Sequence, residues 1–239
     1  MIEISRLEVS GLANALYGMR LPKNSNYLSD TLCVVDCNLN MIKTIHLNDV
    51  TSNDKVLKVI IGEKDKKLAS TLLLAGTDHG KWFRQIQLSM LIKAPMTAWY
   101  DIDTYKVSTV RNSSSRMHKI TSRPLNISDF SFDDTQGNTC DNEYRKIIIR
   151  HINRLIELYN NTKNMEEKEN IFRRIIQDLP QSYNFTSMYT CSAQTARSFY
   201  FARKNHKQKE LRDLANFFAN LPNEQLVSYF ITLGAYKEV

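Results

Sequence analysis

A polar run that ends in an arginine holds the side chains best suited to bind a phosphate. Asn112 and the serines at 113–115 directly precede Arg116. A guanidinium binds phosphate through two parallel hydrogen bonds, and hydroxyls and backbone amides can satisfy the remaining lone pairs. The spacing therefore predicts an anion site, although an exposed arginine on a loop would give the same pattern.

A second basic segment surrounds Arg203, which ends an aromatic helical stripe. On its own, Arg203 is typical of a cation at a helix C-terminus, where the macrodipole favours positive charge. Residues 101–123 carry five Lys or Arg against two Asp, and residues 193–212 carry six against one Glu. These two segments hold the whole excess of the +7 net charge, which favours a discrete anionic ligand over a nucleic-acid coat. Solvated helical faces are the alternative.

Several common catalytic and cofactor motifs are missing. Neither glycine-rich phosphate loop (G-x-G-x-x-G or G-x-x-x-x-G-K-[ST]) occurs, and no G-x-S-x-G marks a serine hydrolase. The five histidines lack metal-ligand spacing, so no metal site is expected. The four cysteines are expected to be reduced structural thiols of a cytoplasmic protein, with a disulfide or zinc site as the alternative. No apolar run approaches the ~18 residues of a membrane span, and residues 1–10 are unlike a secretory signal.

Hydrophobic periodicity predicts one mixed α/β domain over residues 1–239, with a helix-rich C-terminal half. Alternating or β-branched runs predict strands at 2–9, 32–35, 56–61 and 86–92, and an extended segment at 185–191. Helical spacing predicts helices at 12–19, 63–74, 96–102, 142–160, 165–176, 195–203, 208–221 and from 222 towards 233. Residues 109–115 are expected to form an ordered polar loop, and residues 121–141 a variable surface connection.

Two blocks of the sequence carry motifs of one enzyme family. In the first, His79–Gln85 is followed by a strand and by Lys93-Ala94-Pro95. In the second, Leu179-Pro180 precedes an aromatic, Thr-rich strand and then the run Ala202–Glu210. These blocks resemble the flavin-dependent thymidylate synthases, which have His-x-x-Pro-Phe-Glu-His, a strand, often the same Lys-Ala-Pro, and later a helix ending Leu-Arg-x-x-x-His-x-Gln-x-Glu. Their signature Arg-His-Arg-x-x-Ser-x-x-x-x-Ser-x-Arg falls, without a gap, on Thr104, Tyr105, Lys106, Thr109, Ser114 and Arg116.

The resemblance implies a fold, a reaction and a set of site residues. The fold would be the family's α/β architecture, assembled as a homotetramer with sites shared between subunits. Ser114 and Arg116, with Asn112 beside them, would bind dUMP or a related pyrimidine nucleotide, and Arg203 would stabilise negative charge on its ring. Methylenetetrahydrofolate would supply the one-carbon group, FAD the hydride, and NADPH would serve as a further cosubstrate. The residues implied to contact the flavin region are Gln85, Tyr105, Lys106, Thr109, His206 and Gln208.

The sequence also departs from the family at the flavin. The Arg-His-Arg triplet is Thr104-Tyr105-Lys106, which removes two cations, and Gln85 stands where the family has its flavin-stacking histidine. The alternative is a non-catalytic, oligomeric protein that kept the fold and binds a nucleotide or nucleic acid without flavin. A structural α/β protein with solvated basic segments is the third hypothesis.

Overall fold

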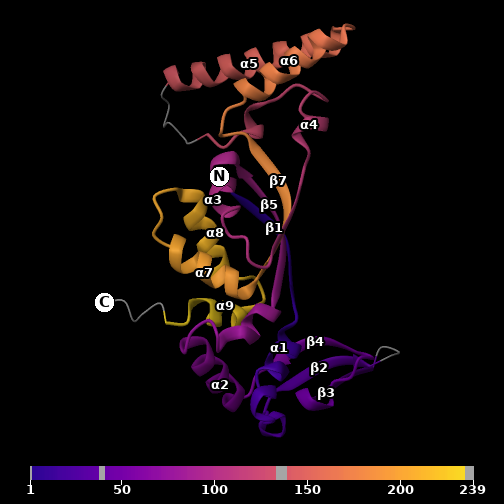
Figure 1. Ribbon diagram of the computed structural model, residues 1–239, viewed down its shortest axis with the longest axis vertical. Coiled ribbons are helices and arrows are strands. Elements are labelled where there is room, and N and C mark those ends of the chain that lie inside the picture. The colour runs from indigo at the N-terminus through magenta and orange to yellow at the C-terminus, as the bar shows by residue number, and fades with distance from the viewer. Residues whose placement is uncertain (1, 38–40, 133–138, 235–239) are drawn as a thin grey trace.

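The computed structural model describes residues 2–37, 41–132 and 139–234, and its elements are stacked along one long axis (Figure 1). A helical hairpin occupies one end, and a four-stranded sheet with helices beside it forms the middle. A smaller, three-stranded sheet lies at the other end. The predicted mixed α/β architecture and helix-rich C-terminal half are confirmed.

The four-stranded sheet is antiparallel throughout, in the order β1-β5-β7-β6. Its two central strands are long and apolar on alternate residues: Leu88, Met90, Ile92 and Ala94 of β5 are fully buried. This alternation places one face of the sheet on the main core. The strands are β1 (Glu3–Ser10), β5 (Gln87–Pro95), β6 (Thr109–Ser113) and β7 (Asn184–Ser192).

Helices from both halves of the chain complete the main core. Phe199, Phe218 and Phe230, each from a different helix, are almost fully buried in it. These helices are short and amphipathic, so packing rather than intrinsic propensity holds them. They are α1 (Leu12–Gly18), α2 (Glu63–Leu74), α3 (Met96–Ile102), α7 (Ala193–Arg203), α8 (Lys209–Ala219) and α9 (Gln225–Thr232).

The small sheet, in the order β3-β2-β4, is joined to α1 and α2 by a buried polar network. Asp65 of α2 is fully buried and accepts hydrogen bonds from Arg20 Nε, Ser29 Oγ and Thr31 Oγ1, each at 2.5 Å. Burying a carboxylate is tolerated only when it is paired and hydrogen-bonded in this way. The strands are β2 (Leu32–Cys37), β3 (Met41–His46) and β4 (Asp54–Ile60).

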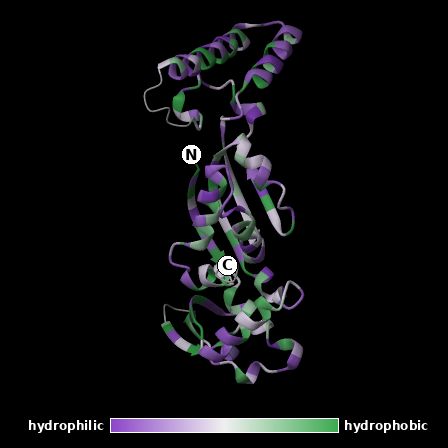
Figure 2. Cartoon of the chain, turned by 90° about the vertical axis from the view of Figure 1, so that its left-hand side faces the viewer, coloured by the Kyte–Doolittle hydropathy of each residue, from purple (hydrophilic) through white to green (hydrophobic). Residues whose placement is uncertain are grey.

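A second core holds the hairpin of α5 (Thr139–Asn161) and α6 (Met165–Asp178). Figure 2 shows apolar and polar residues interspersed along both helices, as amphipathic helices require. The connection expected at 121–141 is not only a surface segment, because Leu125 and Phe130 are buried in this second core. Positions 133–138 of that connection lie outside the described residues.

The structure corrects one predicted segment. Residues 109–113 form strand β6 at the sheet edge instead of a polar loop, because they pair with β7 from Thr109↔Cys191 to Ser113↔Ser187. The short α4 (Arg116–Lys119) follows the strand. No disulfide is formed among the described residues, and Cys33 and Cys191 are buried. None of the described helices is long and apolar enough to cross a bilayer, and the described residues hold no group of three potential metal ligands.

Candidate functional site

A cavity of about 410 Å³ lies between α3 and the edge strand β6. Its walls combine aromatic rings with hydroxyls and two guanidiniums, which is the usual make-up of a site for a small anionic organic ligand. It is lined by Met96, Trp99, Tyr100, Asp103, Arg111, Ser113, Ser114, Arg116, Met117 and Phe185.

The strand period decides which β6 side chains reach the cavity. Arg111 and Ser113 share the face that lines it, whereas Val110 and Asn112 alternate onto the other face and are exposed. Ser114, the first residue after β6, donates its backbone N–H to Thr186 O at 2.9 Å. The structure therefore brings two of the predicted substrate residues, Ser114 and Arg116, to one cavity and does not bring Asn112 there.

Arg116 is the unpaired cation of this cavity. Its Nη1 lies 3.8 Å from Met96 Sδ, and its guanidinium carbon lies 5.2 Å from the Phe185 ring centroid. In the described part of the chain, no carboxylate lies within ion-pair distance of Arg116. Its positive charge is thus available to a ligand, in an aromatic environment where a charge-assisted hydrogen bond is stronger than in water.

Arg111 is a second cation in the cavity wall, and contacts within the protein hold its guanidinium through the ring face, Nε and Nη1. Its guanidinium lies over the Trp99 ring, 3.8 Å from the centroid, and Nη1 forms an ion pair with Asp103 Oδ2 at 2.5 Å. Nε donates to Ser187 Oγ at 3.1 Å, and Ser187 Oγ in turn donates to Ser113 Oγ at 3.0 Å. Burial lowers the pKa of the guanidinium, and the Asp103 carboxylate opposes that shift. Arg111 is consequently held in one orientation.

Arg203 lies on the other side of α3. Its Nη2 donates to Asp101 Oδ1 at 3.0 Å, and Gln208 Nε2 donates to Thr97 Oγ1 at 3.2 Å. Thr97 and Asp101 are four residues apart and share one helix face. The residues of α3 that line the cavity occupy a different face, so a single chain does not bring Arg203 and Arg116 to one ligand. The Nε of Arg203 is buried without a hydrogen-bond partner in the described residues.

Three other predicted residues gather around Arg203. The Tyr105 ring lies 5.8 Å from the Arg203 guanidinium and packs on Phe199 at 4.9 Å. Burial raises the pKa of the Tyr105 phenol, and the Arg203 charge opposes the shift. His206 Nδ1 accepts from the backbone N–H of Gln208 at 3.2 Å.

The remaining predicted residues are scattered. Thr109 Oγ1 donates to the Tyr105 carbonyl at 2.8 Å, and Lys106 is exposed. Gln85, at the end of a 3-10 helix (Gly80–Gln85), lies against α1. A Cβ on Gly18 would stand 3.1 Å from its Oε1, and a Cβ on Gly11 only 2.5 Å from its carbonyl oxygen. Gln85 therefore lies close to the two glycines, is exposed, and does not line the cavity.

Sequence reasoning missed Trp99, Phe185 and the Arg111–Asp103 pair. The signal was present in residues 109–113, where a strand would place Arg111 and Ser113 on one face. Because residues 109–113 were interpreted as a loop, the two-residue alternation of a strand was not considered there.

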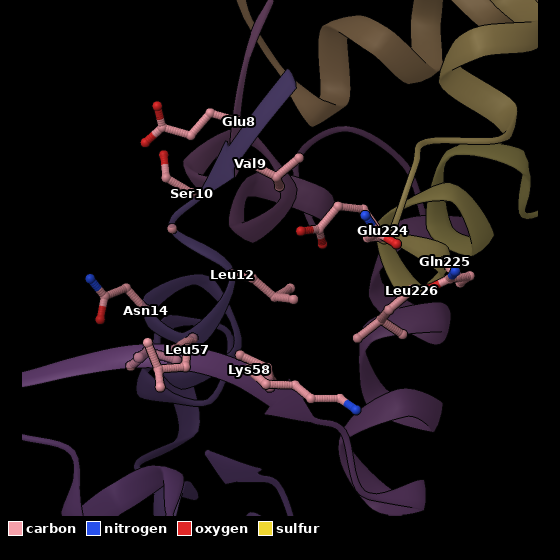
Figure 3. A pocket seen from close by; sticks show the side chains of 15 residues that line it. Glu8, Val9, Ser10, Leu12, Asn14, Leu57, Lys58, Glu224, Gln225 and Leu226 are labelled. Atoms are coloured by element: carbon pink, nitrogen blue, oxygen red, sulfur yellow. The ribbon is translucent and has the colours of Figure 1, made fainter. Parts of the chain in front are cut away.

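A larger cavity of about 640 Å³ lies between the outer edges of the two sheets, formed by β1, β4, the start of α1 and the turn before α9. Figure 3 shows Leu12, Glu224 and Leu226 pointing into it. Burial raises the pKa of the Glu224 carboxyl. None of the predicted site residues lines this cavity.

Comparison with solved structures assigns the fold. A flavin-dependent thymidylate synthase from Helicobacter pylori, complexed with FAD and dUMP, matches with a TM-score of 0.63 and 18% identity, over 94% of this chain and 97% of that one. The chain has the fold of the flavin-dependent thymidylate synthases. A second structure of the Helicobacter pylori enzyme with FAD and dUMP also has a TM-score of 0.63, at 16% identity, over 97% and 99% of the two chains. The thymidylate synthase fold extends to a UMP/dUMP methylase, PolB, from Streptomyces cacaoi bound to 5-Br dUMP, which matches with a TM-score of 0.55 and 16% identity over 97% and 93%. No family model matches the sequence, and no curated protein matches it significantly.

The residues at the flavin positions of the thymidylate synthase motifs can be tested against the structure. Four of them are already bonded or packed within the chain: Tyr105, Thr109, His206 and Gln208. Gln85 lies close to Gly18 of α1 and is exposed. Lys106 is the one cation left in the Thr104-Tyr105-Lys106 triplet, whereas FAD carries an anionic pyrophosphate. Within one chain these residues do not fit FAD.

Proposed function

We propose that this protein binds a pyrimidine nucleoside monophosphate in the cavity between α3 and β6 and catalyses one-carbon transfer to its ring. The observation that carries the proposal is the unpaired Arg116 guanidinium beside the Ser113 and Ser114 hydroxyls, in a cavity walled by Trp99 and Phe185. The fold neighbours that are complexed with dUMP or 5-Br dUMP support the choice of nucleotide.

The nucleotide's phosphate lies at the Arg116 end in this proposal. The guanidinium donates to two phosphate oxygens, and the Ser114 hydroxyl donates to another. The aromatic walls exclude water from these bonds and offer apolar surface to the sugar and base.

Arg203 completes the site from a second copy of the chain. A single chain keeps it behind α3, so its guanidinium must reach the nucleotide of a neighbouring protomer in a homo-oligomer, which we propose to be a homotetramer. There it would stabilise negative charge that develops on the pyrimidine ring. Asp101 holds the guanidinium in a fixed orientation before the nucleotide arrives.

The proposed reaction also needs a carbon donor and a reductant. The resemblance implies methylenetetrahydrofolate and NADPH, with FAD between them, and the fold neighbours from Helicobacter pylori are complexed with FAD.

Two measurements on the purified oligomer test the function. Calorimetric titration should show saturable binding of dUMP, weakened by added salt because the phosphate contact is ionic. With the carbon donor and reductant present, tritium at the substituted ring carbon of dUMP should be released to water. Absence of dUMP binding would refute the proposal.

A second candidate function is a nucleotide-binding protein that does not use flavin. The packing of Tyr105 on Phe199 favours it, because this side chain contributes to the main core. This second candidate function predicts dUMP binding, no flavin absorption in the purified protein and no tritium release. Stoichiometric FAD in the preparation would exclude it.

A further inference from the structure

The Arg111–Asp103 pair is not accounted for by phosphate binding. Asp103 lines the same cavity as Arg116, yet a carboxylate repels a phosphate. The carboxylate must therefore face a part of the ligand that donates hydrogen bonds. A nucleotide has such donors only on its sugar and base, so the pair and the phosphate belong to different ends of the ligand.

The spacing of the elements separates these two ends. Met96, which contacts Arg116, and Asp103 are seven residues apart along α3 and its C-cap, or about 10 Å. Arg111 and Ser114 are three residues apart along extended chain, again about 10 Å. The two separations agree, and they are comparable to the length of a nucleoside monophosphate from its phosphate to the far edge of its base.

The pair has hydrogen-bonding capacity left over. Arg111 uses Nε for Ser187 and Nη1 for Asp103, so Nη2 has no partner in the described residues. Asp103 accepts from Arg111 through Oδ2, which leaves Oδ1 without a donor in that part of the chain. A free donor therefore stands beside a free acceptor, and the Trp99 ring fixes the plane of the donor.

We propose that the Arg111–Asp103 pair recognises the edge of a uracil ring. Arg111 donates a hydrogen bond to a ring carbonyl oxygen, and Asp103 accepts one from the N3–H beside it. The inference rests on the proposed function and adds the residues that select the base. Both groups are oriented by the protein before the ligand arrives, so little order is lost on binding. A ring that lacks the N–H would leave Asp103 Oδ1 desolvated and without a donor, which costs affinity.

N3-methyl-dUMP is the probe, because it keeps the phosphate, sugar and carbonyls of dUMP and replaces only the N3–H. Wild-type protein should bind dUMP roughly 10- to 150-fold more tightly than N3-methyl-dUMP in calorimetry, since a hydrogen bond to a charged group is lost. Asp103→Ala should bring this ratio close to one, and Asp103→Asn, which keeps a neutral acceptor, should lower it by less. The exposed Asp78→Ala is the matched control and should keep the wild-type ratio.

Arg116→Ala separates base reading from phosphate binding. It should weaken both ligands alike and preserve their ratio, because the phosphate is common to them. Equal wild-type affinity for the two ligands, or a ratio that Asp103→Ala and Asp103→Asn leave unchanged, would overturn the inference while the nucleotide site stands. If wild-type protein binds neither ligand, both the proposed function and this inference are wrong.

Discussion

Arg203 Nη2 donates to Asp101 Oδ1 across 3.0 Å, and this ion pair lies behind the helix whose other side forms the cavity. Both partners are partly buried, so the guanidinium is held by Asp101 and is still accessible to solvent. If Arg203 stabilises charge on the ring of a bound nucleotide, its removal affects turnover far more than binding.

Arg203→Ala is expected to lower turnover by about 100- to 1,000-fold, the usual cost of removing one charge-stabilising donor. The affinity for dUMP should change by less than about 10-fold. Turnover by tritium release and affinity by calorimetry give the two numbers. Asp101→Asn keeps the Arg203 charge and loosens its position, so its turnover should lie between wild type and Arg203→Ala. A loss of affinity equal to that of Arg116→Ala would contradict this division of roles.

Arg116→Ala should mainly weaken nucleotide binding. Loss of its charged hydrogen bonds is expected to raise the Kd for dUMP by roughly 10- to 150-fold and to flatten its salt dependence. Arg116→Lys keeps the charge without the paired donors and should recover part of the loss. The melting temperature of the free protein should not fall, because Arg116 has no ion pair to lose in the described residues. Unchanged dUMP affinity in Arg116→Ala would place the phosphate elsewhere.

Asp65→Ala should destabilise the junction of α1, α2 and the small sheet. Removing the carboxylate leaves Arg20 buried and unpaired, a change that costs about 3–5 kcal/mol. The melting temperature should fall by roughly 6–20 °C for a chain of this size. Glu63→Gln, at an exposed position in the first turn of the same helix, is the control and should melt near wild type. Similar melting of both variants would show that the network does not stabilise the fold.

Gly11 and Gly76 make a matched pair for the close approach at Gln85. Both have positive φ, 85° and 110°, so alanine strains either backbone by roughly 1–2 kcal/mol. Only at Gly11 would the new Cβ meet a backbone atom, Gln85 O at 2.5 Å, because nothing lies within 4 Å at Gly76. Gly11→Ala should therefore be the less stable variant in urea unfolding, by a further 1–3 kcal/mol or so. Equal stabilities would mean that the 3-10 helix Gly80–Gln85 moves aside without cost.

Asp129 gives the second core an acid-sensitive contact. Its hydrogen bonds from Arg123, at 2.8 and 2.6 Å, lower the pKa of its carboxyl, although burial opposes the shift. Because the folded pKa is depressed, the stabilisation is fully present above the ordinary Asp pKa of about 3.9 and is lost as pH falls through the lowered value. The stability difference between wild type and Asp129→Asn should stay constant from pH 7 to about 5 and shrink below about pH 4. A difference that grows in acid would be inconsistent with the contact.

The sequence predicted the elements well where one periodicity dominated. The alternation at 86–92 and the helical spacing at 142–160 correspond to β5 and α5, because each buries a continuous apolar face. At 109–113 it failed, because an edge strand with polar residues on both faces carries no hydrophobic signal and is held by its pairing with β7. The sequence also could not predict that α3 separates Arg116 from Arg203. This separation arises only when residues far apart in sequence pack against different faces of α3.

The last turn of α3 ends with acids, Asp101 and Asp103, where the helix dipole already concentrates negative charge. Each is neutralised by an arginine from another element, Arg203 from α7 and Arg111 from β6. Two ion pairs therefore stabilise the C-terminal end of this short helix, where the helix dipole disfavours acidic side chains. An anion that competes with Asp101 or Asp103 for its arginine weakens that ion pair and destabilises the last turn. The order of α3 therefore depends on which anions the two guanidiniums bind.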